Sequence, residues 1–116
     1  MPNYGSLSGG GVATEIFPGD SLILFNAESP TAPQASISLA MGLGAMGRAG
    51  ITFTIAATAG TVQIQGSNQD VAGTYQTLWT TTSVANDMYA DLGGFAYYRA
   101  NITVLSSGTV TVIAQR

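Results

Sequence analysis

The sequence predicts an all-β domain, a jelly-roll-like antiparallel β-sandwich of about eight strands. Short runs in which apolar and polar residues alternate recur along the chain of 116 residues. This alternation is the pattern of strands that are buried on one face. Turn-forming Gly, Pro, Asn, Asp and Ser residues separate the runs at intervals of roughly 8–12 residues, as in a sandwich. No segment has the capped apolar periodicity of an amphipathic helix.

Residues 1–11 read MPNYGSLSGGG and precede the first alternating run. A segment this rich in Gly and Ser, with no apolar period, predicts a flexible arm, so we assign residues 12–116 to the sandwich domain. Tyr4 and Leu7 are the candidate contact residues of the arm. The first residues lack a basic segment followed by an apolar one, so we do not expect a signal peptide.

The first half of the chain contains four segments with the alternation of strands. These segments are residues 12–17, 21–26, 34–41 and 51–56. Pro18 and Gly19 predict a turn between the first two, because Pro presets φ and Gly accepts a positive φ. In the third segment the alternation predicts that Ile37, Leu39 and Met41 lie on the buried face.

The second half contains four further predicted strands. These are residues 62–65, 75–82, 95–104 and 109–114. Residues 85–94 are expected to form a polar connection. Tyr97 and Tyr98 are adjacent in a strand and therefore point to opposite faces, and we expect Tyr97 to lie outside with Arg99 on a contact surface. Ser106, Ser107 and Gly108 predict a turn that joins the last two strands in a hairpin.

The chain contains no His, no Cys and no Lys, and we therefore expect no enzymatic activity. These side chains supply most general bases, thiolate nucleophiles and Schiff-base amines, and His and Cys are frequent metal ligands. Most of the carboxylates fall in predicted turns, where Asp is favoured by backbone hydrogen bonds. Residues 42–47 match G-x-G-x-x-G, but a strand rather than a helix follows, so no dinucleotide site is predicted. We expect no catalytic residue, no cofactor and no metal.

Only 8% of the residues are charged, and the net charge is −3. The cations are Arg48, Arg99 and Arg116. Three scattered arginines cannot neutralise a run of phosphates, so nucleic acid is not an expected partner. No apolar run is long enough to span a bilayer. A surface with so little charge favours a protein that is covered by neighbouring chains, and Arg48 and Arg99 are candidate contact residues.

The last 65 or so residues contain the phrases VQIQGSNQD, YQTLW, YYRANIT and SGTVTV. These phrases resemble a pattern found in small β-sandwich virion proteins of tailed bacteriophages. The matching residues are Val62, Ile64, Gly66, Ser67, Asp70, Tyr75, Leu78, Tyr98, Arg99, Asn101, Thr103, Gly108, Val110 and Val112. The resemblance implies a capsid decoration, or cement, protein at the virion surface. Such a protein would form homotrimers and bridge subunits of the major capsid protein, its partner.

The same phrases also resemble jelly-roll carbohydrate-binding domains of the discoidin type. This resemblance implies an alternative function, a glycan- or receptor-binding module of a phage tail or fibre. In that alternative Tyr75 and Trp79 would stack on sugar rings, which requires that they be exposed. Trp79 would otherwise fill part of the sandwich core.

Overall fold

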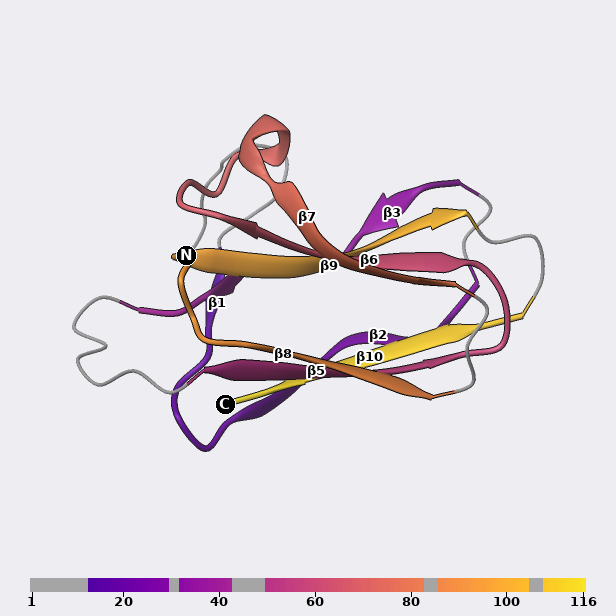
Figure 1. Cartoon of the computed structure of the whole chain (residues 1–116), viewed down its shortest axis with the longest axis horizontal. Coiled ribbons are helices and arrows are strands. Elements are labelled where there is room, and N and C mark those ends of the chain that lie inside the picture. Colours follow the sequence, from indigo (N-terminus) through magenta and orange to yellow (C-terminus); the bar gives the residue numbers. More distant parts are fainter. Residues whose placement is uncertain (1–12, 30–31, 43–49, 83–85, 105–107) are drawn as a thin grey trace.

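Two β-sheets pack face to face in the computed structural model, which describes residues 13–29, 32–42, 50–82, 86–104 and 108–116 (Figure 1). Ten strands and one short 3-10 helix lie within these residues. The strands are β1 (Thr14–Glu15), β2 (Ser21–Glu28), β3 (Gln34–Ala35), β4 (Leu39–Ala40), β5 (Ile51–Ala57), β6 (Thr61–Ser67), β7 (Gln76–Thr82), β8 (Asp87–Asp91), β9 (Tyr97–Val104) and β10 (Val110–Gln115). The helix η2 (Ala72–Thr74) lies between β6 and β7. No helix in the described ranges has the length and hydropathy to cross a membrane.

The strand order confirms the predicted jelly roll. One sheet, here the β9 sheet, has the order β1-β4-β9-β6-β7, with β3 also paired to β9. The other, the β10 sheet, has the order β2-β10-β5-β8. The antiparallel pairs are nested: β2 pairs with β10, β3 and β4 with β9, β5 with β8, and β6 with β7. This is a long hairpin rolled into two sheets, as in a jelly roll, with β3 and β4 as the two halves of one broken strand and β1 added at the edge.

The strand predicted over residues 34–41 is broken, because the side chain of Ser36 takes part in the ladder. The Ser36 hydroxyl accepts a hydrogen bond from the Ala100 N–H at 2.9 Å, and the Ser36 N–H donates to the Ala100 carbonyl at 2.8 Å. The register along β9 shifts by one residue between β3 and β4. Leu39 and Met41 are buried as predicted, but Ile37 is exposed, so its predicted burial was wrong.

The polar connection predicted over residues 85–94 was wrong, because this segment contains β8. The strand pairs with β5, placing Tyr89 opposite Phe53 and Asp91 opposite Ile51. Its inward side chains Asp87, Tyr89 and Asp91 contact polar or aromatic groups of the other sheet. The strand therefore lacks the apolar alternation that would have identified it.

The predicted hairpin between the last two strands was also wrong. β9 pairs with β6, β3 and β4, whereas β10 pairs with β2 and β5 in the opposite sheet. The connection between them therefore passes from one sheet to the other. β9 and β10 each lie inside their own sheet, and each is hydrogen-bonded to strands on both sides. In a simple hairpin these two strands would be paired with each other instead.

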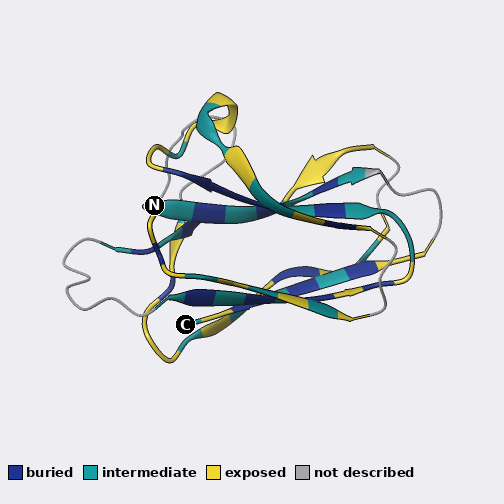
Figure 2. Ribbon diagram, viewed as in Figure 1, coloured by how far each residue is buried: buried dark blue, intermediate teal, exposed yellow. Residues whose placement is uncertain are grey.

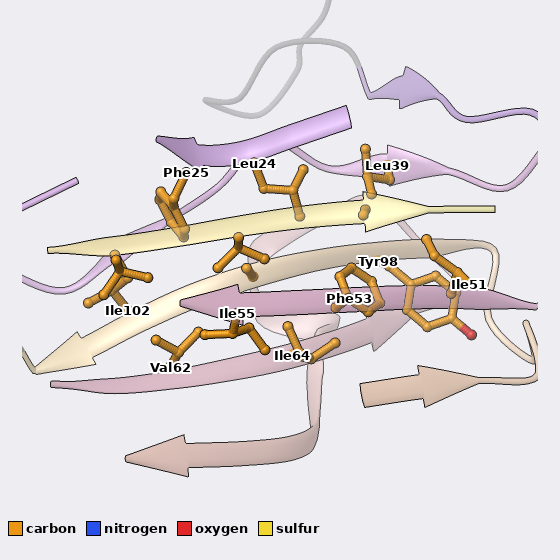
Figure 3. Packing of buried hydrophobic residues seen from close by; sticks show 14 of the residues in the cluster. Leu24, Phe25, Leu39, Ile51, Phe53, Ile55, Val62, Ile64, Tyr98 and Ile102 are labelled. Carbon is orange, nitrogen blue, oxygen red and sulfur yellow. The ribbon is translucent and has the colours of Figure 1, made fainter. Parts of the chain in front are cut away.

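The hydrophobic core fills the space between the sheets, as the buried inner positions of the strands indicate (Figure 2). The core residues are Ile16, Leu24, Phe25, Leu39, Met41, Ile51, Phe53, Ile55, Ala57, Val62, Ile64, Tyr98, Ala100, Ile102, Val110, Val112 and Ala114. Phe53 of the β10 sheet and Tyr98 of the β9 sheet lie close together between the layers, with ring centroids 6.0 Å apart (Figure 3). The turn predicted at Pro18 and Gly19 is present, with Gly19 at φ 94° and a 2.8 Å hydrogen bond from the Asp20 N–H to the Phe17 carbonyl.

Candidate functional site

The outer face of the β9 sheet carries Tyr97 and Arg99, two of the predicted contact residues. Strand alternation places them there, since Tyr98 and Ala100 between and beside them are fully buried. Asn101 follows on the same side of β9. The predicted opposition of Tyr97 and Tyr98 is therefore confirmed, and one strand presents an aromatic ring, a cation and an amide to the outside.

Neighbouring strands extend this face with uncharged polar side chains. In register across the sheet, Arg99 lies opposite Gln65 of β6, and Gln65 lies opposite Thr77 of β7. The next row pairs Asn101 with Gln63. We call this surface the Arg99 face, and it consists of Gln63, Gln65, Thr77, Tyr97, Arg99 and Asn101. Its side chains interact: Arg99 Nε donates to Gln65 Oε1 at 2.8 Å, and Asn101 Nδ2 donates to Gln63 Oε1 at 3.3 Å.

The segment around η2 lies on the outer side of the β9 sheet (Figure 1). Tyr75, which follows η2, contacts Arg99 of this face. The guanidinium carbon of Arg99 lies 4.1 Å from the centroid of the Tyr75 ring, within the range of a cation–π contact. The Tyr75 hydroxyl donates to Asp70 Oδ1 at 3.0 Å. Burial raises the pKa of Tyr75, a change opposed by a hydrogen bond with Ser38 and reinforced by Asp70. Tyr75 is therefore a neutral, fixed cover above Arg99.

Trp79 is placed differently from Tyr75, because it points between the two sheets. Its ring stacks on Tyr89 of β8 with centroids 5.5 Å apart and an interplanar angle of 16°. Beside this pair, the Thr81 hydroxyl donates to Asp87 Oδ2 at 2.9 Å. These contacts close the side of the sandwich where β7 and β8 lie at the edges of their sheets. Trp79 is partly buried against the core, and this supports the core interpretation rather than an open sugar platform.

A polar cluster joins the sheets near the end of β8. Asp91 accepts hydrogen bonds from the hydroxyls of Tyr98 and Tyr89 and, at 3.0 Å, from the Gly93 N–H. Burial acts to raise the pKa of the Asp91 carboxyl, but these hydrogen bonds outweigh it and lower the pKa below its ordinary value. Burial and the bond to Asp91 raise the pKa of Tyr98. The cluster therefore holds a carboxylate that is hydrogen-bonded to two neutral phenols where the sheets meet.

The outer face of the β10 sheet, here the β10 face, carries no charge. It consists of Ser21, Ile23, Thr52, Thr54, Ala56, Met88, Ala90, Thr111, Ile113 and Gln115. Ile23, Ile113, Thr54 and Met88 lie in one row across the four strands. At the ends of this row the side chains of Ile23 and Met88 are 59% and 63% exposed. The face is therefore uncharged and partly apolar.

A shallow pocket of about 220 Å³ lies beside the end of β6. Its lining residues are Gly66, Ser67, Asn68, Gln69, Thr74, Gln76 and Phe95. Phe95 packs so closely on Gly66 that a Cβ atom there would lie 2.8 Å from the ring. The lining is neutral, with amide groups around one aromatic ring. No sequence pattern indicated this pocket, since Phe95 and Gly66 meet only through the pairing of β6 with β9.

The remaining predicted contact residues, Tyr4, Leu7 and Arg48, lie outside the described residues, as does the predicted arm. Of the residues that the structure describes, no three acidic side chains gather as a metal site would require. Comparisons with protein-family models, with curated proteins and with solved structures gave no match for this chain.

Proposed function

We propose that this chain is a non-enzymatic virion structural protein of a tailed bacteriophage. Its role would be capsid decoration, in which copies bind the outside of the shell and bridge subunits of the major capsid protein as a homotrimer. The resemblance of the C-terminal half supports this proposal, and the jelly roll is a fold that viral capsid proteins often use. Because one fold can serve many functions, the evidence for this function must come from the protein surface.

The uncharged β10 face is the observation that carries the proposal. Exposed Ile23 and Met88 on a face without charges would favour association in water, since burying them removes apolar surface from solvent. From the spacing of strands and residues, the face measures about 400 Å². A stable interface buries about 800 Å² on each partner. One face is therefore too small alone, and stable attachment would require several copies that act together.

Co-sedimentation of the purified chain with shells built from the major capsid protein of the same phage tests the proposal. We expect the unaltered chain to sediment with the shells. Ile23→Lys places a charge at the end of the row across the β10 face, so we expect at least about tenfold weaker binding. Val71→Lys is the matched control, because Val71 is 49% exposed and lies between β6 and β7 of the opposite sheet. It should bind as the unaltered chain does.

Three results would oppose this proposal. The unaltered chain could fail to sediment with the shells, which would exclude decoration. Both lysine variants could bind equally well, in which case the β10 face would not be the contact. A purified chain that remained monomeric by light scattering at all concentrations would exclude the homotrimer.

A glycan- or receptor-binding module is the second candidate, and the pocket beside Phe95 favours it. Amides around an aromatic ring match the hydroxyl groups and apolar faces of a neutral sugar. A glycan array probed with the full chain tests this function. We expect any binding to be lost in Gln76→Ala, whose exposed side chain lines the pocket, and kept in Thr80→Ala on the same strand. Absence of binding to every glycan would reject this candidate.

A further inference from the structure

Arg99 is held in one orientation by groups on two sides. Its Nε donates to Gln65 Oε1 at 2.8 Å, and the Tyr75 ring covers the guanidinium at 4.1 Å. A side chain that is already ordered loses little conformational entropy when it binds a ligand. The Arg99 face is therefore preorganised around one cation.

Gln65 is itself held in place by burial and hydrogen bonds, so the fold sets the orientation of Arg99. The Gln65 side chain is only 8% exposed. Its Nε2 donates to Gln63 Oε1 at 3.3 Å and to Thr77 Oγ1 at 3.5 Å. With the amide nitrogen engaged on that side, the amide oxygen faces Arg99.

The two terminal nitrogens of Arg99 are the hydrogen-bond donors that a ligand would meet. Within the described part of the chain, Nη1 and Nη2 make no hydrogen bond, and no carboxylate forms an ion pair with Arg99. Neither nitrogen is buried away from solvent. A guanidinium edge with two parallel N–H donors matches the two oxygens of a carboxylate.

The surroundings favour a single negative charge over a phosphate. The neighbours Gln63, Thr77 and Asn101 are neutral, and they add hydrogen-bonding groups without a second cation. Asp70, on the hydroxyl of Tyr75, adds a negative charge near the same end of the face. A dianion would meet this charge with only one arginine to balance it.

We propose that Arg99 is a receptor site for a carboxylate, supplied by an acidic side chain of a partner protein. The claim that a protein supplies the carboxylate rests on the proposed function, whereas the carboxylate site itself does not. Tyr and Arg are the residue types that most often dominate binding at protein interfaces. In this arrangement Tyr75 and Gln65 are positioning residues, and Arg99 makes the contact.

Titration of the full ¹⁵N-labelled chain with sodium acetate, followed by NMR, tests the site. We expect saturable shifts of the Gln65 side-chain amide and of the residue 99 backbone amide, with a midpoint on the order of tens of millimolar. Sodium chloride at the same ionic strength should produce no saturable shift. Arg99→Lys keeps the charge but loses the planar edge, so it should bind acetate about fivefold more weakly or worse.

Arg116→Lys is the matched control, because the Arg116 guanidinium donates to the carbonyls of Ile16 and Met41 away from this face. It should leave acetate binding unchanged, and thermal unfolding checks that both variants fold. Equal responses to acetate and chloride would overturn the site, and so would tighter binding of phosphate than of acetate.

A blocked glutamate and glucuronic acid separate the sources of the carboxylate. If glucuronic acid bound tenfold more tightly than blocked glutamate, the claim that a protein supplies the carboxylate would be overturned. If acetate binds but the chain fails to sediment with shells, the site stands and the decoration role fails.

Discussion

The hydroxyl of Tyr98 in the β9 sheet donates a hydrogen bond to the carboxylate of Asp91 in the β10 sheet. Tyr98 is fully buried, and its ring packs on Phe53 and Phe95 at centroid distances of 6.0 Å in each case. The residue therefore joins the sheets twice, through its ring and through its hydroxyl. This link predicts how the stability of the sandwich responds to mutation and to acid.

Tyr98→Phe should lower the free energy of unfolding by about 1.5–3 kcal/mol, because it removes a hydrogen bond to a charged group and keeps the ring. Urea unfolding measures this change. Tyr97→Phe removes a hydroxyl from the neighbouring residue on the outer face and should stay within about 0.5 kcal/mol of the unaltered chain. Equal effects of the two variants would contradict the role of the Tyr98–Asp91 bond.

Stability should depend on the ionisation of Asp91 in acid. The pKa of Asp91 is lower in the folded protein than the unfolded value of about 3.9. Its ionised form therefore stabilises the fold fully above that value, and the contribution is lost as pH falls through the folded pKa. Near pH 6, Asp91→Asn should have a lower free energy of unfolding than the unaltered chain. This difference should shrink as the pH falls to about pH 2, as unfolding measured across this range would show. A difference between the two proteins that is constant with pH would exclude this linkage.

Two glycines should respond oppositely to alanine. A Cβ at Gly50 would lie 2.3 Å from the backbone oxygen of Asp91, so Gly50→Ala forces the backbone apart and should cost about 2 kcal/mol or more. A Cβ at Gly73 meets nothing within 4 Å, and Gly73→Ala should be neutral or stabilising by up to about 1 kcal/mol. Thermal unfolding of the two variants makes the comparison. A stable Gly50→Ala protein would mean that β5 and the end of β8 are not this close.

Trp79 should report on the closed edge of the sandwich through its fluorescence. Because its ring is partly buried against the core and covered on one side by Tyr89, its emission should lie at shorter wavelength than that of tryptophan in water. Tyr89→Ala opens this contact, so the emission should move to longer wavelength and the free energy of unfolding should fall by about 1–3 kcal/mol. Emission typical of free tryptophan in the unaltered chain would instead support an exposed sugar-stacking ring.

Alternation alone was enough to predict the strands whose inner residues are apolar. In β5 the pattern of Ile51, Phe53 and Ile55 predicted the buried face directly, and all three are buried. β8 escaped prediction because its inward residues Asp87 and Asp91 bond to polar partners on the opposite sheet. These partners lie on β7 and β9, the strands before and after β8 in the chain, and the alternation within one strand does not show that the chain crosses between the sheets on both sides of β8.

The candidate site was likewise predictable from the sequence only in part. Alternation along β9 was sufficient to place Tyr97 and Arg99 on one outer face. The cover that Tyr75 forms over Arg99 depends on how the segment around η2 folds back across the sheet. The fixed orientation of Gln65 depends on the register between β6, β7 and β9. These relationships arise from tertiary structure, and the sequence carried no sign of them.

Electron cryomicroscopy of shells incubated with the purified chain tests the decoration role most directly. We expect density for a two-layered β-sandwich on the outer surface, in threefold clusters that contact more than one major capsid subunit. Shells that remain bare at saturating protein concentration, or density confined to a tail, would contradict the account.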